Sequence, residues 1–208
     1  MIYMFLAPGF EEVEALAPLD LLRRAGLEVR TISIRTAAYN AFLERCYKVG
    51  MSAANIWEDT YTVTGAHGIK VTAELHEGHL IRMLADGKFS PEAVILPGGM
   101  PGTSNLDGSP NVEKALKQAD KVNAYLCAIC AAPMILGKRG YLNGKRATCF
   151  PGFETYLEGA TVGGKVIRDG RIITAAGMGV AQEFGLEIIS ALVSPEKAGE
   201  IRAAIQSL

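Results

Sequence analysis

Hydrophobic residues recur along the chain in two patterns, short continuous runs and stripes of helical spacing. The run Ile2–Leu6 is typical of a buried strand, and one apolar stripe then extends with helical period along residues 11–25. Residues 27–34 alternate between apolar and polar positions, as a second strand does. These three elements predict a strand–helix–strand unit with a right-handed crossover.

The same alternation continues to the end of the chain. Strands that alternate with helices predict an α/β fold, with a mostly parallel sheet covered on both faces. The length of 208 residues suits one domain, which we expect to extend over residues 1–208. The further strands are expected at 93–96, 122–129 and 146–149, a hairpin at 166–174 turning at Asp169-Gly170, and helices at 112–119, 131–138, 180–192 and 195–205.

Residues 35–59 interrupt this rhythm. Apolar residues at 39, 42, 43, 46 and 47 have the spacing of an amphipathic helix, and the only tryptophan follows at Trp57. We therefore expect an inserted helical segment at about 35–59. It is either a helical excursion packed on the domain, or a lid or dimer contact beside the site; an engineered insertion is a further alternative.

Composition excludes several classes of protein. The 21 Lys and Arg residues are balanced by 22 Asp and Glu, so no basic excess favours nucleic-acid binding. No apolar run approaches the roughly 18 residues of a membrane span. The first residues are typical of a strand rather than a signal peptide, so we expect a cytoplasmic protein with reduced cysteines and no disulfide scaffold.

Three segments are expected at the carboxyl edge of the sheet, where open parallel sheets bind ligands: 8–14, 97–99 and 128–133. The third has the form of a nucleophile elbow, because a buried strand ends at Cys130 and small residues follow it. A thiol at a helix N-terminus has its thiolate stabilised by free N–H groups. The alternative is an inert, buried cysteine.

A carboxyl and a pair of glycines complete this candidate site. Glu14 lies on the apolar stripe of its helix, so a protonated Glu14 pointing inward would donate a hydrogen bond to a Cys130 thiolate and then act as general acid/base. Otherwise it lies at the edge of the stripe and reaches water. Gly98 and Gly99 offer backbone N–H groups that, with that of Ala131, suit an oxyanion. Otherwise they form an ordinary turn.

Other cysteines and histidines carry weaker signals. Cys127 and Cys130 form a Cys-x-x-Cys pair, but Cys127 should lie inside the strand, which favours a packed thiol over redox chemistry. His67 lies in a turn that either approaches the site or is merely exposed. His76 and His79 lack a third obvious metal ligand, so a solvated helix face is favoured and no metal site is expected.

Together these segments resemble the ThiJ/PfpI superfamily, in its parkinsonism-associated deglycase branch. The resemblance covers nearly all of the chain except 35–59. It rests on Gly9-Phe10-Glu11-Glu12-Val13-Glu14-Ala15, Leu96-Pro97-Gly98-Gly99-Met100-Pro101-Gly102 and Ala128-Ile129-Cys130-Ala131-Ala132-Pro133, with support from residues 20–26, 64–68 and 147–153.

The resemblance implies a flavodoxin-like three-layer sandwich, usually a homodimer, without metal or organic cofactor. It implies that Cys130 is the nucleophile and Glu14 its carboxyl partner, with Gly99 and Ala131 lining the oxyanion pocket. Members are credited with glyoxalase activity on methylglyoxal, removal of glycation adducts, redox sensing and chaperone-like behaviour. A small aldehyde is the implied substrate.

Three positions depart from the pattern that the resemblance implies. Ala131 stands where the protease-like branch has a histidine, which argues against a Cys-His protease. Phe150 stands where this branch often has a histidine, and Ala176 where it has an arginine, which puts anionic substrates in doubt. The leading hypothesis is a cofactor-independent enzyme acting on 2-oxoaldehydes. The alternatives are an oxidative-stress sensor or chaperone working through Cys130, and a catalytically silent protein whose extra helix recruits a partner or covers the pocket.

Overall fold

A seven-stranded, mostly parallel sheet forms the centre of the structure, a computed structural model that describes residues 1–36, 45 and 60–207. Its strand order is β10-β11-β7-β6-β1-β2-β5, and only β10 pairs with its neighbour in antiparallel fashion. The strands are β1 (Ile2–Leu6), β2 (Val29–Ser33), β5 (Leu75–His76), β6 (Ala93–Leu96), β7 (Tyr125–Ile129), β10 (Val166–Asp169) and β11 (Ile172–Ala175).

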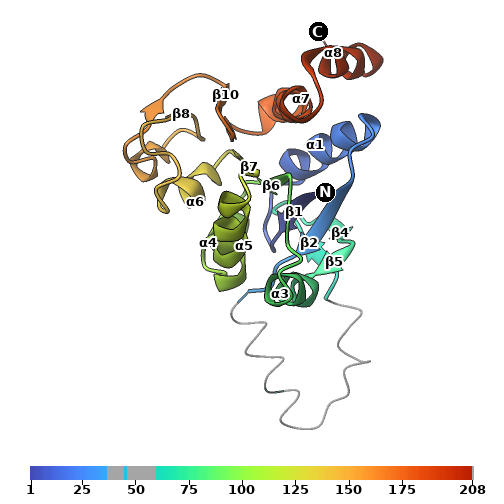
Figure 1. Cartoon of the computed structure of the whole chain (residues 1–208), viewed down its shortest axis with the longest axis vertical. Coiled ribbons are helices and arrows are strands. Elements are labelled where there is room, and N and C mark those ends of the chain that lie inside the picture. Colours follow the sequence, from blue (N-terminus) through green and yellow to red (C-terminus); the bar gives the residue numbers. More distant parts are fainter. Residues whose placement is uncertain (37–44, 46–59, 208) are drawn as a thin grey trace.

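Helices cover both faces of this sheet (Figure 1). One face carries α1 (Glu12–Arg24), α7 (Ala181–Leu192) and α8 (Pro195–Ala204). The other carries α3 (Glu77–Ala85), α4 (Gly102–Asp107), α5 (Pro110–Lys121) and α6 (Pro133–Gly137). The expected three-layer, flavodoxin-like α/β architecture is therefore confirmed.

Two small ribbons lie outside the main sheet. The antiparallel pair of β3 (Thr62–Thr64) and β4 (Lys70–Thr72) forms a hairpin whose tip is residues 65–69. A short parallel pair joins β8 (Arg146–Ala147) to β9 (Thr161–Val162). The structure also contains the 3-10 turns η2 (Glu154–Tyr156) and η3 (Met178–Val180).

Alternation along the strands divides the core into two layers. In β1, Ile2, Met4 and Leu6 pack toward α1 and α7, whereas Tyr3 and Phe5 pack toward α3 and α5. Because successive side chains of a strand point to opposite faces, an entirely apolar strand is what a sheet covered on both faces requires. The apolar run at the start of the chain thus supplies both cores at once.

Close packing of α1 against α7 depends on a glycine. A Cβ on Gly185 would lie 3.0 Å from both the Cα of Pro18 and the Cδ1 of Leu21. The missing side chain lets the two helices approach, and this fixes the position of α1 over the sheet. The first turn of α1 is held in turn by Glu11, whose carboxylate accepts a 2.6 Å hydrogen bond from the Glu14 N–H.

Most of the expected elements are present, with shifted ends. The hairpin at 166–174 turns at Asp169-Gly170 as expected. The helix expected at 131–138 begins only at Pro133, because residues 130–132 form a tight turn, and the strand expected at 146–149 has only two residues. The inserted helical segment expected at about 35–59 lies outside the described residues, apart from 35, 36 and 45.

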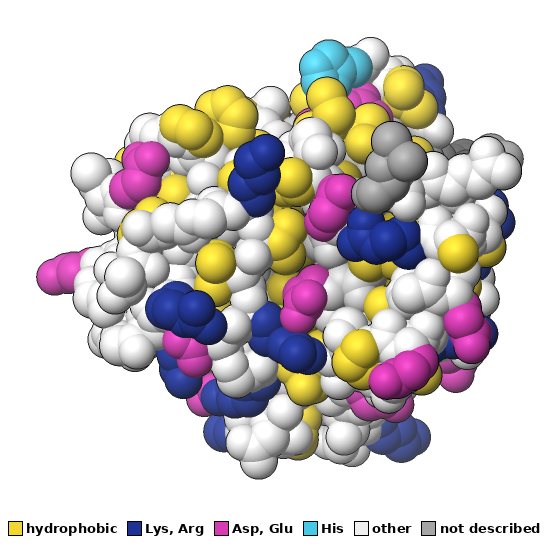
Figure 2. Space-filling view, turned by 90° about the horizontal axis from the view of Figure 1, so that it is seen from above, with side chains coloured by type: hydrophobic (Ala, Val, Ile, Leu, Met, Phe, Trp, Pro, Cys, Tyr) yellow, Lys and Arg dark blue, Asp and Glu magenta, His cyan; other side chains and the backbone are white. Residues whose placement is uncertain are grey.

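The surface seen in Figure 2 is mixed in character. Lys and Arg side chains lie among Asp and Glu, with hydrophobic side chains between them. Exposed ion pairs such as Arg24 with Asp20 and Arg168 with Glu187 contribute to this mixture. Within the ranges that the structure describes, no helix combines the length and the apolar character that a membrane span needs.

Candidate functional site at the carboxyl edge of the sheet

The three segments singled out in the sequence meet at the carboxyl edge of the central strands. The Glu11 N–H donates to the Gly98 carbonyl at 2.9 Å, and the Gly102 N–H donates to the Gly9 carbonyl at 3.1 Å. The Gly98 N–H donates to Oε2 of Glu14 at 3.1 Å. The loops after β1 and β6 are thus bonded directly to each other, and Glu14 lies between them and Cys130.

Cys130 follows β7 with a backbone conformation that is unusual for a residue with a side chain. Its φ is +64°, in the left-handed region, which costs on the order of 1–2 kcal/mol for a non-glycine residue. Two hydrogen bonds hold it there, from the Cys130 N–H to the Ala175 carbonyl at 2.8 Å and from the Phe150 N–H to the Cys130 carbonyl at 2.7 Å. This sharp strand-to-helix turn is the geometry of a nucleophile elbow, and it leaves the cysteine only partly buried.

Glu14 points inward, as one of the two readings of its helix stripe predicted. It is 1% exposed, and its carboxyl group is a hydrogen-bond partner of the Cys130 thiol. Backbone N–H groups of Gly98 and Met178 also donate to it. Burial raises the pKa of Glu14 to about 7, and the neighbouring charge of Glu11 adds to the effect.

Burial acts against the thiolate that the sequence predicts at Cys130. Burial, followed by the charge of Glu14, raises the pKa of the Cys130 thiol to about 12, although N–H groups of Gly99 and Ala131 oppose the shift. The expected helix-dipole stabilisation is weak because α6 has only five residues and starts at Pro133. The two groups act on each other, so the proton that they share when the pair carries one negative charge belongs to the pair rather than to either residue.

Gly98 is required by the closeness of these groups. A Cβ on Gly98 would lie 2.5 Å from Oε2 of Glu14, 2.6 Å from the Cβ of Cys130 and 2.8 Å from the Ile129 carbonyl oxygen. Gly99, at a φ of +86°, would bring a Cβ into the backbone of residues 9–11. The two glycines thus form the wall of the site as well as its N–H donors.

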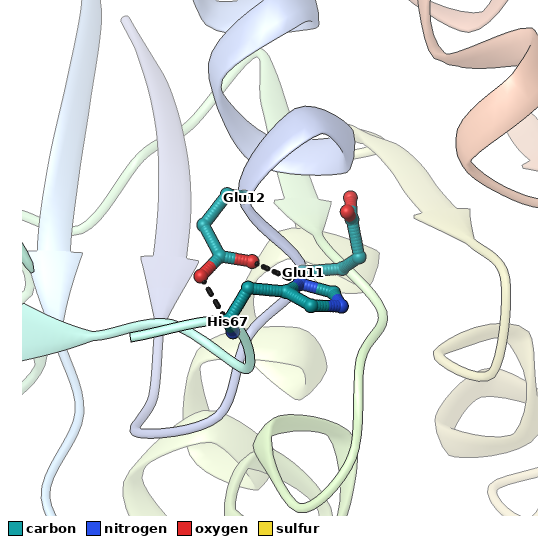
Figure 3. A group of neighbouring side chains, drawn as sticks. All are labelled: Glu11, Glu12 and His67. Atoms are coloured by element: carbon teal, nitrogen blue, oxygen red, sulfur yellow. Dashed lines mark hydrogen bonds and ion pairs between the residues drawn. The ribbon is translucent and has the colours of Figure 1, made fainter. Parts of the chain in front are cut away.

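A neighbouring carboxylate, which the sequence reasoning did not single out, fixes the β3–β4 hairpin to α1. Glu12 accepts hydrogen bonds from the His67 N–H at 2.8 Å and from His67 Nδ1 at 2.9 Å (Figure 3). It also accepts one from the Ile69 N–H at 3.4 Å. Burial pushes the pKa of Glu12 up, but these donors outweigh it, and the net pKa is lowered. The same contact raises the pKa of His67.

His67 therefore belongs to this clasp, defined as Glu12, His67 and Ile69, rather than to the Cys130 site. Its side chain is 72% exposed. Ligand-type atoms of Glu11, Glu12 and His67 lie within 4.8 Å of one another. The oxygens of Glu12 already accept protein hydrogen bonds, and Glu11 accepts the one from the Glu14 N–H, so the group is explained as a structural clasp.

The other two histidines lie at the start of α3, and the preferred reading of a solvated face is wrong for His76. His76 is 6% exposed, and its Nδ1 accepts the Gly78 N–H at 3.0 Å, which caps the helix. Its ring packs edge-on against that of His79, with centroids 4.2 Å apart. Glu77 accepts hydrogen bonds from Ser109 and Asn111 and takes no part in a histidine site.

Two further cysteines in the described part of the chain are free and buried. Cys127 packs inside the core on the α1 face, so the packed-thiol reading of the Cys-x-x-Cys pair is confirmed. Cys149 is buried beside the site, directly before Phe150. Phe150 itself is 47% exposed and lies at the rim of the site, where it was expected as a possible pocket residue.

A separate cavity of about 290 Å³ opens at the carboxyl ends of β1 and β2. Its walls include Ser33, Thr62 and Val63, and neither Cys130 nor Glu14 lines it. The described residues that line it include no cysteine, histidine or carboxyl group, so the chemistry points instead to the site around Cys130.

The chain is similar in sequence and in structure to proteins of one known family. The model of the DJ-1/PfpI family matches residues 1–191. The protein dj-1beta of Drosophila melanogaster is 28% identical over 207 residues, which cover 95% of this chain and 92% of that protein. The crystal structure of Drosophila melanogaster DJ-1beta superimposes on this chain with a TM-score of 0.80. The two are 27% identical, and the match covers 100% of this chain and 97% of that chain.

Two other relatives cover different shares of sequence. Protein DJ-1 homolog A of Arabidopsis thaliana is 33% identical over 204 residues, which are 96% of this chain but 45% of that protein. The chain thus spans less than half the length of this plant relative. The glutathione-independent glyoxalase DJR-1.2 of Caenorhabditis elegans is 35% identical over 116 residues, 53% of this chain and 60% of that protein.

Replacing Gly98 by alanine tests the packing of the site. We expect Gly98→Ala to lower the free energy of unfolding by about 1–3 kcal/mol, because the added methyl group overlaps Glu14 and Cys130. Gly163→Ala is the matched control, since nothing lies within 4 Å of the position of its Cβ, and it should change stability by less than about 0.5 kcal/mol. Urea unfolding of both variants measures this; equal effects would contradict the described wall.

The raised pKa of Glu14 predicts a pH dependence of stability. The ordinary value is 4.5 and the folded value about 7, so the folded chain binds this proton more tightly. The resulting stabilisation is fully present below the ordinary value and is lost as the pH rises through about 7. Glu14→Gln removes this dependence.

We therefore compare the free energy of unfolding of Glu14→Gln with that of the unmodified protein at about pH 5 and at about pH 8. The value for the variant minus the value for the unmodified protein should be larger at pH 8 than at pH 5, by roughly 1–3 kcal/mol. Urea unfolding of both proteins at the two pH values gives this double difference, in which other titrating groups cancel. If the difference in free energy of unfolding between the two proteins is the same at both pH values, Glu14 ionises as an ordinary exposed carboxyl group does.

Proposed function

Since the chain belongs to the DJ-1/PfpI family, we propose that it is a cofactor-independent enzyme that converts reactive 2-oxoaldehydes to 2-hydroxy acids without glutathione. Cys130 is the nucleophile and Glu14 the general acid/base. The observation that carries the proposal is the buried Glu14 carboxyl group against a thiol held at a φ of +64°. The relative named as a glutathione-independent glyoxalase supports the choice of reaction.

The first step joins sulfur to the aldehyde carbon. As the Cys130 sulfur attacks, its proton passes to the Glu14 carboxylate. Glu14 then delivers this proton to the carbonyl oxygen, which gives a hemithioacetal and restores the carboxylate. A thiol with a raised pKa can react in this way because the base takes its proton during the attack. A carboxyl group with a pKa of about 7 is well matched to this transfer near neutral pH.

The second step moves hydrogen between the two carbons. Glu14 removes the proton from the former aldehyde carbon, and the resulting enediol takes a proton at the neighbouring carbon, which gives a thioester of the 2-hydroxy acid. Water then cleaves the carbon–sulfur bond of the thioester, releasing the acid and restoring the thiol. One carbon is oxidised and its neighbour reduced, so the reaction needs no external electron acceptor.

The N–H groups around the sulfur have a role in the first and last steps. The N–H groups of Gly99 and Ala131 act on the Cys130 sulfur as backbone donors and lower the pKa of its thiol. This supports a role for them as donors to the oxygen that becomes negatively charged on the attacked carbon. Donors of this kind each contribute about 10²–10³-fold to the rate in enzymes that use them. Gly98 supports the same wall by holding Glu14 in place.

The proposal predicts Cys130-dependent formation of lactate from methylglyoxal in the absence of glutathione. Cys130→Ser should abolish turnover, and Glu14→Gln should reduce kcat/KM by about 10²–10⁴-fold because the proton relay is lost. The value of kcat/KM should rise with pH through about 7, as the pair loses its first proton. Chiral product analysis and a pH profile measure both effects.

Cys127→Ala provides the matched control for this assay, because Cys127 is a buried core thiol away from the elbow. It should retain turnover if the fold is intact. Equal inactivity of the unmodified protein and Cys130→Ser would overturn the enzymatic proposal. Equal activity of the unmodified protein and Cys130→Ser would show that Cys130 is not the nucleophile.

A second candidate function is oxidative sensing through the same sulfur. A protonated Glu14 and the N–H groups of Gly99 and Ala131 offer donors for a sulfinate on Cys130. Mild peroxide should then add two oxygen atoms, about 32 Da, to the peptide that contains Cys130. Intact mass and peptide mapping measure this, and oxidation confined to Cys46 or Cys149 would contradict it.

The remaining expectations stay predictions. A homodimer and a cytoplasmic location follow from the resemblance and the sequence pattern. So does the choice of a small aldehyde as the substrate. The homodimer and the location do not enter the reaction steps above, whereas the aldehyde does.

A further inference from the structure

Phe150 is fixed beside the proposed nucleophile by its own backbone. Its N–H donates to the Cys130 carbonyl at 2.7 Å, so the two residues cannot move apart without breaking the elbow. A methyl group on Gly177 would lie 3.3 Å from the Phe150 ring and 3.9 Å from Oε1 of Glu14. The ring therefore lies over Gly177, next to the carboxyl group, and is 47% exposed.

Met178 provides a second apolar side chain at the same rim. Its N–H donates to the Glu14 carboxyl group, while its side chain is 53% exposed. It directly follows Gly177, against which the Phe150 ring lies. Phe150 and Met178, here called the apolar rim, are thus both tethered by their main chains to the Cys130–Glu14 pair.

The charges that act on this pair are negative. Glu11 acts on Glu14 and raises its pKa, and Glu14 acts in the same direction on the Cys130 thiol. The remaining glutamate at the start of α1 is Glu12, which has a lowered pKa and is bonded to His67. An anionic substrate approaching the sulfur thus meets the carboxyl groups of Glu14 and Glu11 at close range, and like charges repel each other.

From these observations we infer that the site selects uncharged carbonyl compounds carrying an aromatic or other hydrophobic substituent, and disfavours anionic ones such as glyoxylate. Phe150 is the residue that distinguishes the hydrophobic substituent, and Glu11 contributes to the exclusion of anions. This inference deepens the proposed function and rests on it for the identity of the substrate. The selectivity for charge and aromatic groups at the sulfur is a property of the site itself.

Alkylation of Cys130 measures that property without turnover. Iodoacetamide and iodoacetate react alike: sulfur bonds to the methylene carbon, iodide leaves, and the thiol proton passes to Glu14 or solvent. They differ in the negative charge of iodoacetate. The anilide of iodoacetic acid adds a neutral phenyl ring. Rates at the Cys130 peptide, each divided by the rate of a small uncharged thiol at the same pH, give the selectivity of the site.

We expect the normalised rate for iodoacetamide to exceed that for iodoacetate by at least about tenfold. The anilide should react about fivefold faster than iodoacetamide on the same normalised scale, as contact with one aromatic ring suggests. Phe150→Ala keeps the backbone N–H and should remove the advantage of the anilide while leaving the difference between amide and acid. Glu11→Gln keeps an oxygen for the Glu14 N–H and should reduce that difference instead.

The companion assay compares kcat/KM for phenylglyoxal, methylglyoxal and glyoxylate. Absence of turnover with every aldehyde, together with selective alkylation, would overturn the proposed function and leave the selectivity standing. Equal normalised alkylation rates for the three reagents would overturn the inference, whatever the enzyme assay shows. An anilide advantage that persists in Phe150→Ala would remove Phe150 from it.

Discussion

A carboxyl group and a thiol that share a small, buried space are the constraint around which this edge of the fold is organised. Glu14 is almost fully buried, and a buried carboxylate without partners would be costly. Its partners are two backbone N–H groups and the Cys130 thiol, so the proton that the pair holds compensates part of this cost. The strained backbone of Cys130 is held by hydrogen bonds to Ala175, at the end of β11, and to Phe150, rather than by the thiol itself.

The location of the proton in this pair also explains how a thiol with a raised pKa can be a nucleophile. A carboxylate with a neutral thiol and a carboxylic acid with a thiolate contain the same number of protons. They therefore give the same pH dependence, and only their proportions differ. Burial acts against a charge on either group of the pair. Transfer of the proton from sulfur to the carboxyl group during attack needs no proton to leave the site.

The sequence predicted the fold and the inward direction of Glu14, because both depend on periodicity. Glu14 lies on the stripe of Phe10 and Leu21, and β1 is apolar on both faces. The protonation of Cys130 was not predictable, because it depends on the depth of burial and on where α6 begins. The clasp was missed because adjacent glutamates at a helix start look like ordinary dipole-stabilising acids. Gly65, whose Cβ would collide with Glu12, was the signal that could have revealed it.

The first turn of α1 presents two carboxyl groups in opposite directions. Residues two apart on a helix are separated by about 200° around its axis, so Glu12 faces the hairpin while Glu14 faces the elbow. One short piece of helix thus serves as a common anchor for a surface ribbon and for the proton of the reactive pair. Residues of the exposed ribbon, although distant along the chain from Cys130, are thus bonded to the same helical turn that carries the carboxyl partner of the sulfur.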